Sequence, residues 1–183
     1  MKIIASVLIV VVATLQGYAQ KYFTRDGKIS FSSDAPMEKI EAVNNKVSSV
    51  LDIQTGDLEF AVLIKSFHFA KALMEDHFNE NYLESNKYPK ATFKGKITNL
   101  ADMKLTLNGD YRAAVQGDLT IHGVTKPVQA DGTLSVLNGV IHATSTFDIT
   151  VADYNIEIPK VVRENIAKIV QIRVDINYKS LEE

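Results

Sequence analysis

The alternation of apolar and polar side chains is the feature of this sequence that most constrains its fold. In residues 111–121 the two kinds of residue take opposite parities: Tyr111, Ala113, Val115, Leu119 and Ile121 against Arg112, Gln116, Asp118 and Thr120. Residues 27–31, 57–69 and 169–178 repeat the pattern. A period of two is what a β-strand with one buried and one solvated face requires. The sequence therefore predicts a largely β protein.

Asn138-Gly139 is the strongest turn motif of the chain, and it predicts a hairpin of defined register. Both central residues of a type I′ turn need a positive φ, which Asn and Gly tolerate best. With these two residues as the loop, apolar residues oppose apolar ones: Val136 with Ile141, Leu134 with Ala143, Ala130 with Phe147 and Val128 with Ile149. A slip of one residue would destroy this match.

Residues 70–83 depart from the β pattern. Apolar or aromatic residues recur there at steps of three and four: Ala70, Leu73, Met74, His77, Phe78 and Tyr82. The charged residues take the other side: Lys71, Glu75, Asp76 and Glu80. This spacing predicts a helix with one apolar stripe. Tyr88-Pro89 ends the region, because a residue before proline avoids helical backbone, and a strand resumes at Ala91.

Many short strands between turns, about eight or nine of them, are typical of a β-sandwich or a β-barrel. The periodicity alone does not separate these two all-β architectures. Closing the sheet would remove exposed strand edges, and an eight-stranded barrel can just hold one small ligand inside. Because neither a linker nor an internal repeat interrupts the sequence, we expect one domain over residues 20–183.

The first nineteen residues have the pattern of a secretory signal peptide. Lys2 is followed by an apolar run, Ile3 to Leu15, and then by Gly17-Tyr18-Ala19, which offers small residues for cleavage before Gln20. The run is shorter than the roughly 20 residues that span a bilayer. We therefore expect cleavage, no transmembrane segment afterwards, and a periplasmic or secreted protein.

Composition excludes several function classes. The 183 residues contain no cysteine, so disulfides, thiolate metal sites and Cys nucleophiles are ruled out. The formal charge of −2 gives no electrostatic reason to expect a nucleic-acid partner. We also expect no metal site and no cofactor: His68, His122 and His142 form no ligand cluster with carboxylates, and the glycines form no phosphate-binding loop.

Catalytic motifs are equally scarce. No G-x-S-x-G elbow occurs, and Asp148, Asp153 and Glu157 are more typical of solvated strand ends than of an acid–base pair. His77 falls on the apolar stripe of the predicted helix, where it is either a hydrogen-bonded core residue or a polar group at a pocket mouth. The sequence predicts no catalytic residues and a protein that is not an enzyme.

A conspicuous aromatic set is either simply core or the lining of a cavity: Phe67, Phe69, Phe78, Tyr82, Phe93, Tyr111 and Phe147. Spacing does not decide between the two. Three stretches bear on the question, and with the closing strand 169–178 they are distributed over residues 76–178: 76–93, which contains Asp76-His77-Phe78 and Tyr88-Pro89; 117–128, with the sequence GDLTIHGVTKPV; and 152–156, with the sequence ADYNI.

These stretches resemble the motifs of YceI-like proteins, in the same order. The resemblance implies an eight-stranded antiparallel lipocalin-like barrel with one short helix packed near a barrel mouth. It also implies an exported protein that binds a polyisoprenoid, a quinone-like compound or a fatty amphiphile inside the barrel; a homodimer is compatible with it. The ligand-binding residues we expect on this basis are Phe67, Phe69, Leu73, His77, Phe78, Tyr82, Phe93, Tyr111 and Val115.

Two alternatives stay open at this point. A barrel filled by its own side chains would act as a protein-interaction module in the cell envelope, and coordinates without a continuous apolar cavity would favour it. A hydrolase or isomerase would need acids and histidines within hydrogen-bond reach of one another in a cleft.

Overall fold

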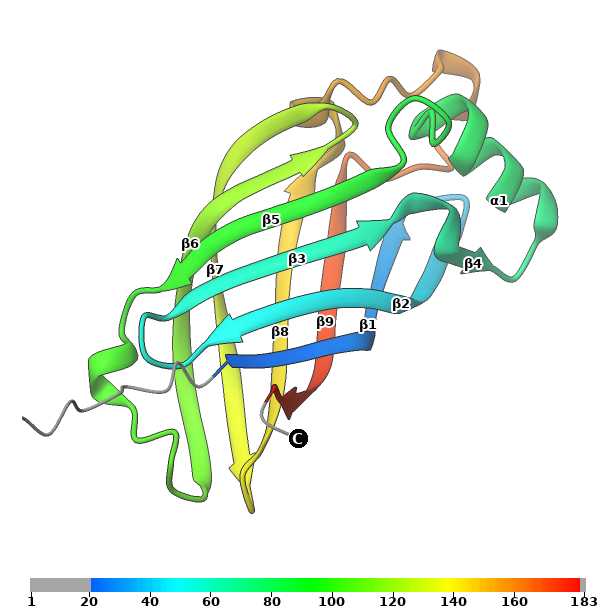
Figure 1. Cartoon of the computed structure of the whole chain (residues 1–183). Helices are drawn as coiled ribbons and strands as arrows, with labels where there is room; N and C mark the ends of the chain where they lie inside the picture. Colours follow the sequence, from blue (N-terminus) through cyan, green and yellow to red (C-terminus); the bar gives the residue numbers. More distant parts are fainter. Residues whose placement is uncertain (1–20, 182–183) are drawn as a thin grey trace, which may run out of the picture.

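The computed structural model describes residues 21–181, so the predicted signal peptide lies outside the described residues. Eight long antiparallel strands form a closed sheet in the order β1-β9-β8-β7-β6-β5-β3-β2, and the pairing of β1 with β2 closes it (Figure 1). This confirms the predicted eight-stranded barrel. The strands are β1 Lys21–Asp34, β2 Lys39–Asp52, β3 Asp57–Leu63, β5 Lys90–Ile97, β6 Gly109–Ile121, β7 Val124–Leu137, β8 Val140–Thr150 and β9 Ile169–Ser180.

The predicted hairpin register is confirmed near the turn and wrong further up. Strands β7 and β8 pair from Leu137↔Val140 to Gly132↔Ser145. The expected pairs Ala130 with Phe147 and Val128 with Ile149 are not formed, because the ladder ends at Ser145. The Ser145 hydroxyl donates to the carbonyl of Asp131 at 2.6 Å, at the position where the next backbone hydrogen bond would form. Above this point β7 bends away from β8 (Figure 1).

The predicted strand over 57–69 is interrupted. The 3₁₀ turn η1, Ile64–Ser66, separates β3 from the short strand β4, Phe67–Phe69. Strand β3 pairs with β2 and β5, whereas β4 pairs with β2 alone, at Ala42–Asn44. The turn therefore carries Phe67 and Phe69 past the end of β5 toward one end of the barrel.

The predicted helix forms and is slightly shorter than expected. The helix α1, Ala72–His77, continues without a break into the π-helical turn η2, Phe78–Tyr82. It lies beside β4 at one end of the barrel (Figure 1). Three further 3₁₀ turns complete the chain: η3 Leu100–Asp102, η4 Val151–Tyr154 and η5 Lys160–Val162. In residues 21–181 no helix is long and apolar enough to cross a membrane.

The core closes the opposite end of the barrel, where the turn between β7 and β8 lies. Leu51, Ile141 and Ile176 are completely buried there, and Leu105 joins them from the loop between β5 and β6. A second cluster, which includes Ile64, Tyr154 and Val170, packs η4 against the end that carries the helix. One end of the barrel is therefore solid, and the interior near the helix is free for a site.

Candidate ligand cavity inside the barrel

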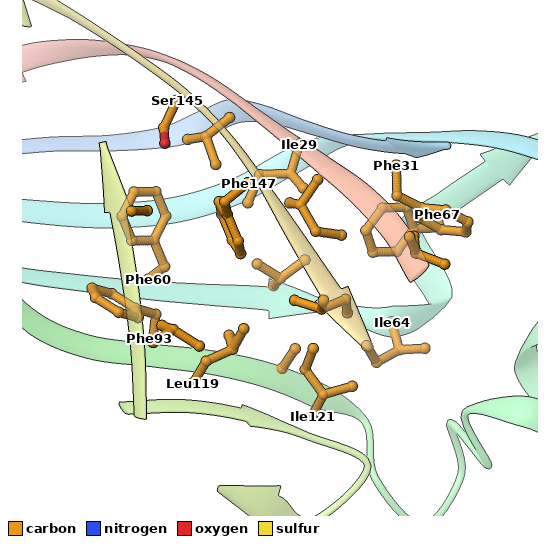
Figure 2. A pocket seen from close by; sticks show the side chains of 18 of the residues that line it. Ile29, Phe31, Phe60, Ile64, Phe67, Phe93, Leu119, Ile121, Ser145 and Phe147 are labelled. Carbon is orange, nitrogen blue, oxygen red and sulfur yellow. The ribbon is translucent and has the colours of Figure 1, made fainter. Parts of the chain in front are cut away.

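The interior of the barrel contains a cavity of about 440 Å³. Its wall is made by the inward-facing side chains of the strands, among them Phe60 of β3, Leu119 of β6 and Phe147 of β8 (Figure 2). These side chains point inward because the alternation along each strand places every second residue on this face. In the part of the chain that the structure describes, neither Lys nor Arg lines the cavity. The wall therefore suits an apolar guest.

Four phenylalanines form a cluster where the cavity approaches the helix. Phe31 of β1 lies 5.4 Å from Phe67 and 5.5 Å from Phe78, measured between ring centroids. Phe69 lies 5.0 Å from Phe78. These separations are typical of favourable aromatic pairs. The cluster joins β1, β4 and η2, and so fixes the helix over this end of the barrel.

Phe93 lies deeper in the cavity, over two glycines. Gly95 of β5 is directly opposite Gly117 of β6. A Cβ atom on Gly117 would come within 2.7 Å of Cζ of Phe93. The two glycines therefore leave room for the ring, which pairs with Phe60 at a centroid distance of 6.2 Å (Figure 2).

The structure brings seven of the nine expected site residues to the cavity wall: Phe67, Phe69, His77, Phe78, Tyr82, Phe93 and Val115. Leu73 and Tyr111 do not line it. Leu73 points outward from α1 and is 66% exposed. The Tyr111 hydroxyl lies toward the loop between β5 and β6, where it donates to the carbonyl oxygens of Lys104 and Leu107.

Polar groups gather at the mouth of the cavity, beside the helix. Glu38 lines the cavity and accepts a hydrogen bond from Lys71 at 2.8 Å. This contact holds the pKa of Glu38 below its usual value. Asn165 and Ser33 also line the mouth, and the Ser33 hydroxyl accepts a hydrogen bond from the backbone of Ala167. The mouth can therefore hold a polar group while the wall below it holds an apolar one.

His77 and Tyr82 complete this mouth. His77 lines the cavity and is solvent-exposed, which places it at a pocket mouth and not in the core. Tyr82 is half-buried, and burial raises the pKa of its hydroxyl. The phenol is therefore a neutral hydrogen-bonding group at ordinary pH.

The other histidines lie outside the cavity, each beside one carboxylate. Nε2 of His122 lies 2.7 Å from Glu84, and Nδ1 lies 3.2 Å from the carbonyl oxygen of Tyr154. His142 contacts Asp175 at 2.8 Å. His68 lies 3.6 Å from Glu75. Within residues 21–181, no group of three or more metal-ligating side chains is assembled.

The sequence stretch 117–128 contributes to both the wall and its support. Leu119, Ile121 and Val128 line the cavity. His122 and Gly123 form the turn between β6 and β7 with positive φ values of 51° and 75°. Their neighbours Glu84 and Tyr88 belong to the segment that follows the helix, so this turn holds that segment in place.

Several members of the wall are not among the expected site residues. Phe31 lies in the predicted strand 27–31 and Phe147 belongs to the aromatic set, but the sequence pattern places neither at the site. Ile158, Val162 and Ile166 line the cavity from the segment between β8 and β9. Strand parity could have identified Phe31 and Phe147, whereas no periodic pattern marks that segment.

The fold and the cavity together define the class of protein: a lipocalin-like barrel with one packed end and one polar mouth above an apolar interior. The family profile of the YceI-like domain matches residues 12–178. The chain therefore belongs to the YceI-like family, as the sequence motifs predicted.

Curated relatives match only part of this chain. A UPF0312 protein from Vibrio parahaemolyticus is 30% identical over 99 residues, which are 54% of this chain and 43% of the relative. A UPF0312 protein from Pseudomonas putida is 34% identical over 110 residues, 60% of this chain and 45% of the relative. The chain thus spans less than half the length of these relatives.

Solved structures share the fold at low sequence identity. A polyisoprenoid binding domain from Saccharophagus degradans, implicated in plant cell wall breakdown, has a TM-score of 0.76 and 16% identity. The match covers 89% of this chain and 99% of that domain. BcnA from Burkholderia cenocepacia has a TM-score of 0.68 and 20% identity, with 84% and 96% covered.

Proposed function

We propose that this protein is an exported binding or carrier protein that holds an isoprenoid or another amphiphilic lipid inside its barrel. The observation that carries the proposal is the cavity of about 440 Å³ with an apolar wall and a polar mouth. This volume lies within the range of about 300–1,000 Å³ that is usual for ligand pockets. The polyisoprenoid-binding neighbour of the same fold supports the choice of ligand class.

The geometry suits an amphiphile with its tail inward. Burying a prenyl tail against the strand faces contributes roughly 25 cal/mol per Å² of apolar surface, before the cost of ordering the chain. The head group would meet Glu38, Lys71, His77 and Tyr82 at the mouth. Because the wall offers no ionised partner beyond the mouth, a charged head would be disfavoured deeper in the barrel.

The two alternatives are less well supported. A filled barrel predicts an interior without a continuous apolar cavity, and the cavity argues against it. A hydrolase or isomerase needs convergent acids and bases, but among residues 21–181 the titratable members of the wall are only Glu38, His77, Tyr82 and Tyr178. Tyr178 lies at the packed end, hydrogen-bonded to Ser49. This arrangement favours binding over acid–base catalysis.

The experiment that tests the proposal is native mass spectrometry of the protein purified from its own host, followed by organic extraction. We expect a bound species whose mass matches an isoprenoid, a quinone or another amphiphilic lipid released on extraction. Protein that is consistently empty, and that takes up neither prenyl alcohols nor fatty acids after delipidation, would contradict the proposal.

Export is tested separately. N-terminal sequencing of the protein recovered from the cell envelope or medium should give Gln20 as the first residue. Recovery of the uncleaved chain from the cytoplasm would contradict the exported role and leave the binding role standing.

A further inference from the structure

We infer that the rim of the cavity mouth docks on the surface of a phospholipid bilayer. The inference rests on the proposed function, because a lipid carrier must exchange its ligand with a membrane. Three solvated apolar side chains motivate it: Met37, Leu73 and Val161 are 72%, 66% and 90% exposed. Single exposed apolar residues are ordinary, but these three share one arrangement around the mouth.

Each of the three is the direct neighbour of a residue that lines the cavity. Met37 precedes Glu38, Leu73 precedes Met74, and Val161 precedes Val162; all three second members face the cavity. The outward residues therefore surround the mouth that their neighbours line. Figure 1 shows their three segments, the turn between β1 and β2, helix α1 and the brown connection before β9, at the same end of the barrel.

Hydrogen bonds tie these segments into one rim. The backbone N–H of Met37 donates to the carbonyl of Glu164 at 3.1 Å, which joins the turn between β1 and β2 to the connection before β9. Lys71, at the start of α1, donates to Glu38 of the same turn at 2.8 Å. The three apolar side chains are therefore presented together and not on independent loops.

The cations next to the most exposed side chain can contact lipid phosphate groups. Lys160 precedes Val161 and Arg163 follows it by two residues, and both are exposed. Exposed acids, among them Asp34, Asp76 and Glu164, lie on the same segments, so this attraction is local and does not reflect a net positive charge of the rim. An apolar side chain beside two cations is suited to the boundary between acyl chains and lipid phosphates. Docking there would bring the mouth of the cavity directly to the lipid and shield a tail from water during exchange.

The opposite end of the barrel supplies a matched control. Leu137 and Val140 flank the turn between β7 and β8 and are 65% and 53% exposed. Neither residue nor its direct neighbours line the cavity. If exposed apolar area alone caused membrane binding, this end would bind equally well.

The test is co-sedimentation of the purified protein with vesicles made of phosphatidylcholine and phosphatidylglycerol in equal parts. The double variant Met37→Asp/Val161→Asp should lower the partition coefficient about tenfold or more, because it replaces inserted apolar groups with anions. The control Leu137→Asp/Val140→Asp should bind as the wild type does. All four residues are exposed, so circular dichroism and the unfolding midpoint should stay unchanged.

Equal sedimentation of the rim variant and the wild type would overturn the inference, and so would a loss confined to the control. The bound lipid of each variant is measured in parallel by native mass spectrometry. A rim variant that keeps its bound lipid and loses vesicle binding supports the inference. A rim variant that binds vesicles as the wild type does and still holds lipid refutes only the docking rim. The proposed function then remains intact.

Discussion

Phe93, Gly95 and Gly117 show how single residues create the interior space. Two small residues face each other across β5 and β6, and the ring of Phe93 occupies the room that their missing side chains leave. Val115 lies two residues from Gly117 on the same face and completes the wall at this depth. The wall here is entirely apolar, so a single charge has large consequences for a bound tail.

Val115→Asp should abolish lipid binding while leaving the fold intact. The new carboxylate would face an apolar cavity that has neither Lys nor Arg in its wall, so a bound tail would have to desolvate an unpaired charge. We expect at least a tenfold loss of bound lipid, about 1.4 kcal/mol, in native mass spectra. Gln116→Asp, on the exposed face of β6, is the control. Equal lipid occupancy of the two variants would contradict the assignment of this face.

Tyr178 is a buried residue whose effect depends on pH. Its hydroxyl lies 2.7 Å from the Ser49 hydroxyl, which itself donates to the carbonyl of Glu59. The tyrosine therefore donates its proton to Ser49. Burial raises the pKa of Tyr178 above the ordinary value, so the folded state keeps a proton that the unfolded chain releases above about pH 10.

Tyr178→Phe should therefore flatten the loss of stability at alkaline pH. The stabilisation by the neutral phenol is fully present below about pH 10 and declines as pH rises further. The measurement is the free energy of unfolding by urea from neutral pH to about pH 11. At neutral pH the variant should lose about 1 kcal/mol with the hydrogen bond. A slope above pH 10 identical to that of the wild type would show that Tyr178 is not the titrating group.

The chemistry of the turns determined which strand pairings the sequence could predict. Asn138-Gly139 gave the correct register because both residues adopt positive φ, 51° and 80°. The ladder beyond Gly132 was mispredicted because a side chain, Ser145, replaces a backbone donor at that point, and residue parity carries no information on such a substitution.

Strand β2 was missed for a related reason. Its buried residues are even-numbered at first, Ala42 and Asn44, and then odd-numbered: Val47, Ser49 and Leu51. The alternation is therefore interrupted in the middle of the strand. The facing strand β1 has register shifts at the same level, between Thr24 and Ile29. Such bulges insert a residue without changing composition. Strand parity placed Val115 and Phe93 on the inner face. It could not be applied to Leu73, which lies in α1 and was placed by helical spacing instead.

Gly139→Ala tests the turn of the β7–β8 hairpin. Nothing lies within 4 Å of the added methyl group, so the substitution causes no steric clash. Its effect comes only from the free energy of the positive-φ backbone conformation. We expect a loss of about 1–2 kcal/mol in the free energy of unfolding, the cost of a left-handed conformation for a residue with a Cβ atom. Urea denaturation measures it. An unchanged midpoint would mean that the turn tolerates a different geometry, and the register would then need another cause.

The whole molecule is asymmetric along the barrel axis. One end is closed by fully buried side chains such as Leu51 and Ile141. The other end carries the phenylalanine cluster, the polar mouth and the exposed rim, and the rim is built on segments that connect strands. The hydrogen-bonded strands of the packed end therefore serve as a rigid scaffold. The connections at the other end, which tolerate sequence change better, would contact the ligand and the membrane.

Binding of a lipid tail inside the barrel, the claim on which the proposed function rests, is tested by photo-cross-linking with a prenyl alcohol that carries a diazirine on its tail. Because the chain contains no cysteine, thiols cannot compete for the carbene. We predict label on peptides that contain Phe93, Leu119 and Phe147. Label confined to exposed residues such as Leu137 and Val161, with the inner wall unmodified, would contradict the claim.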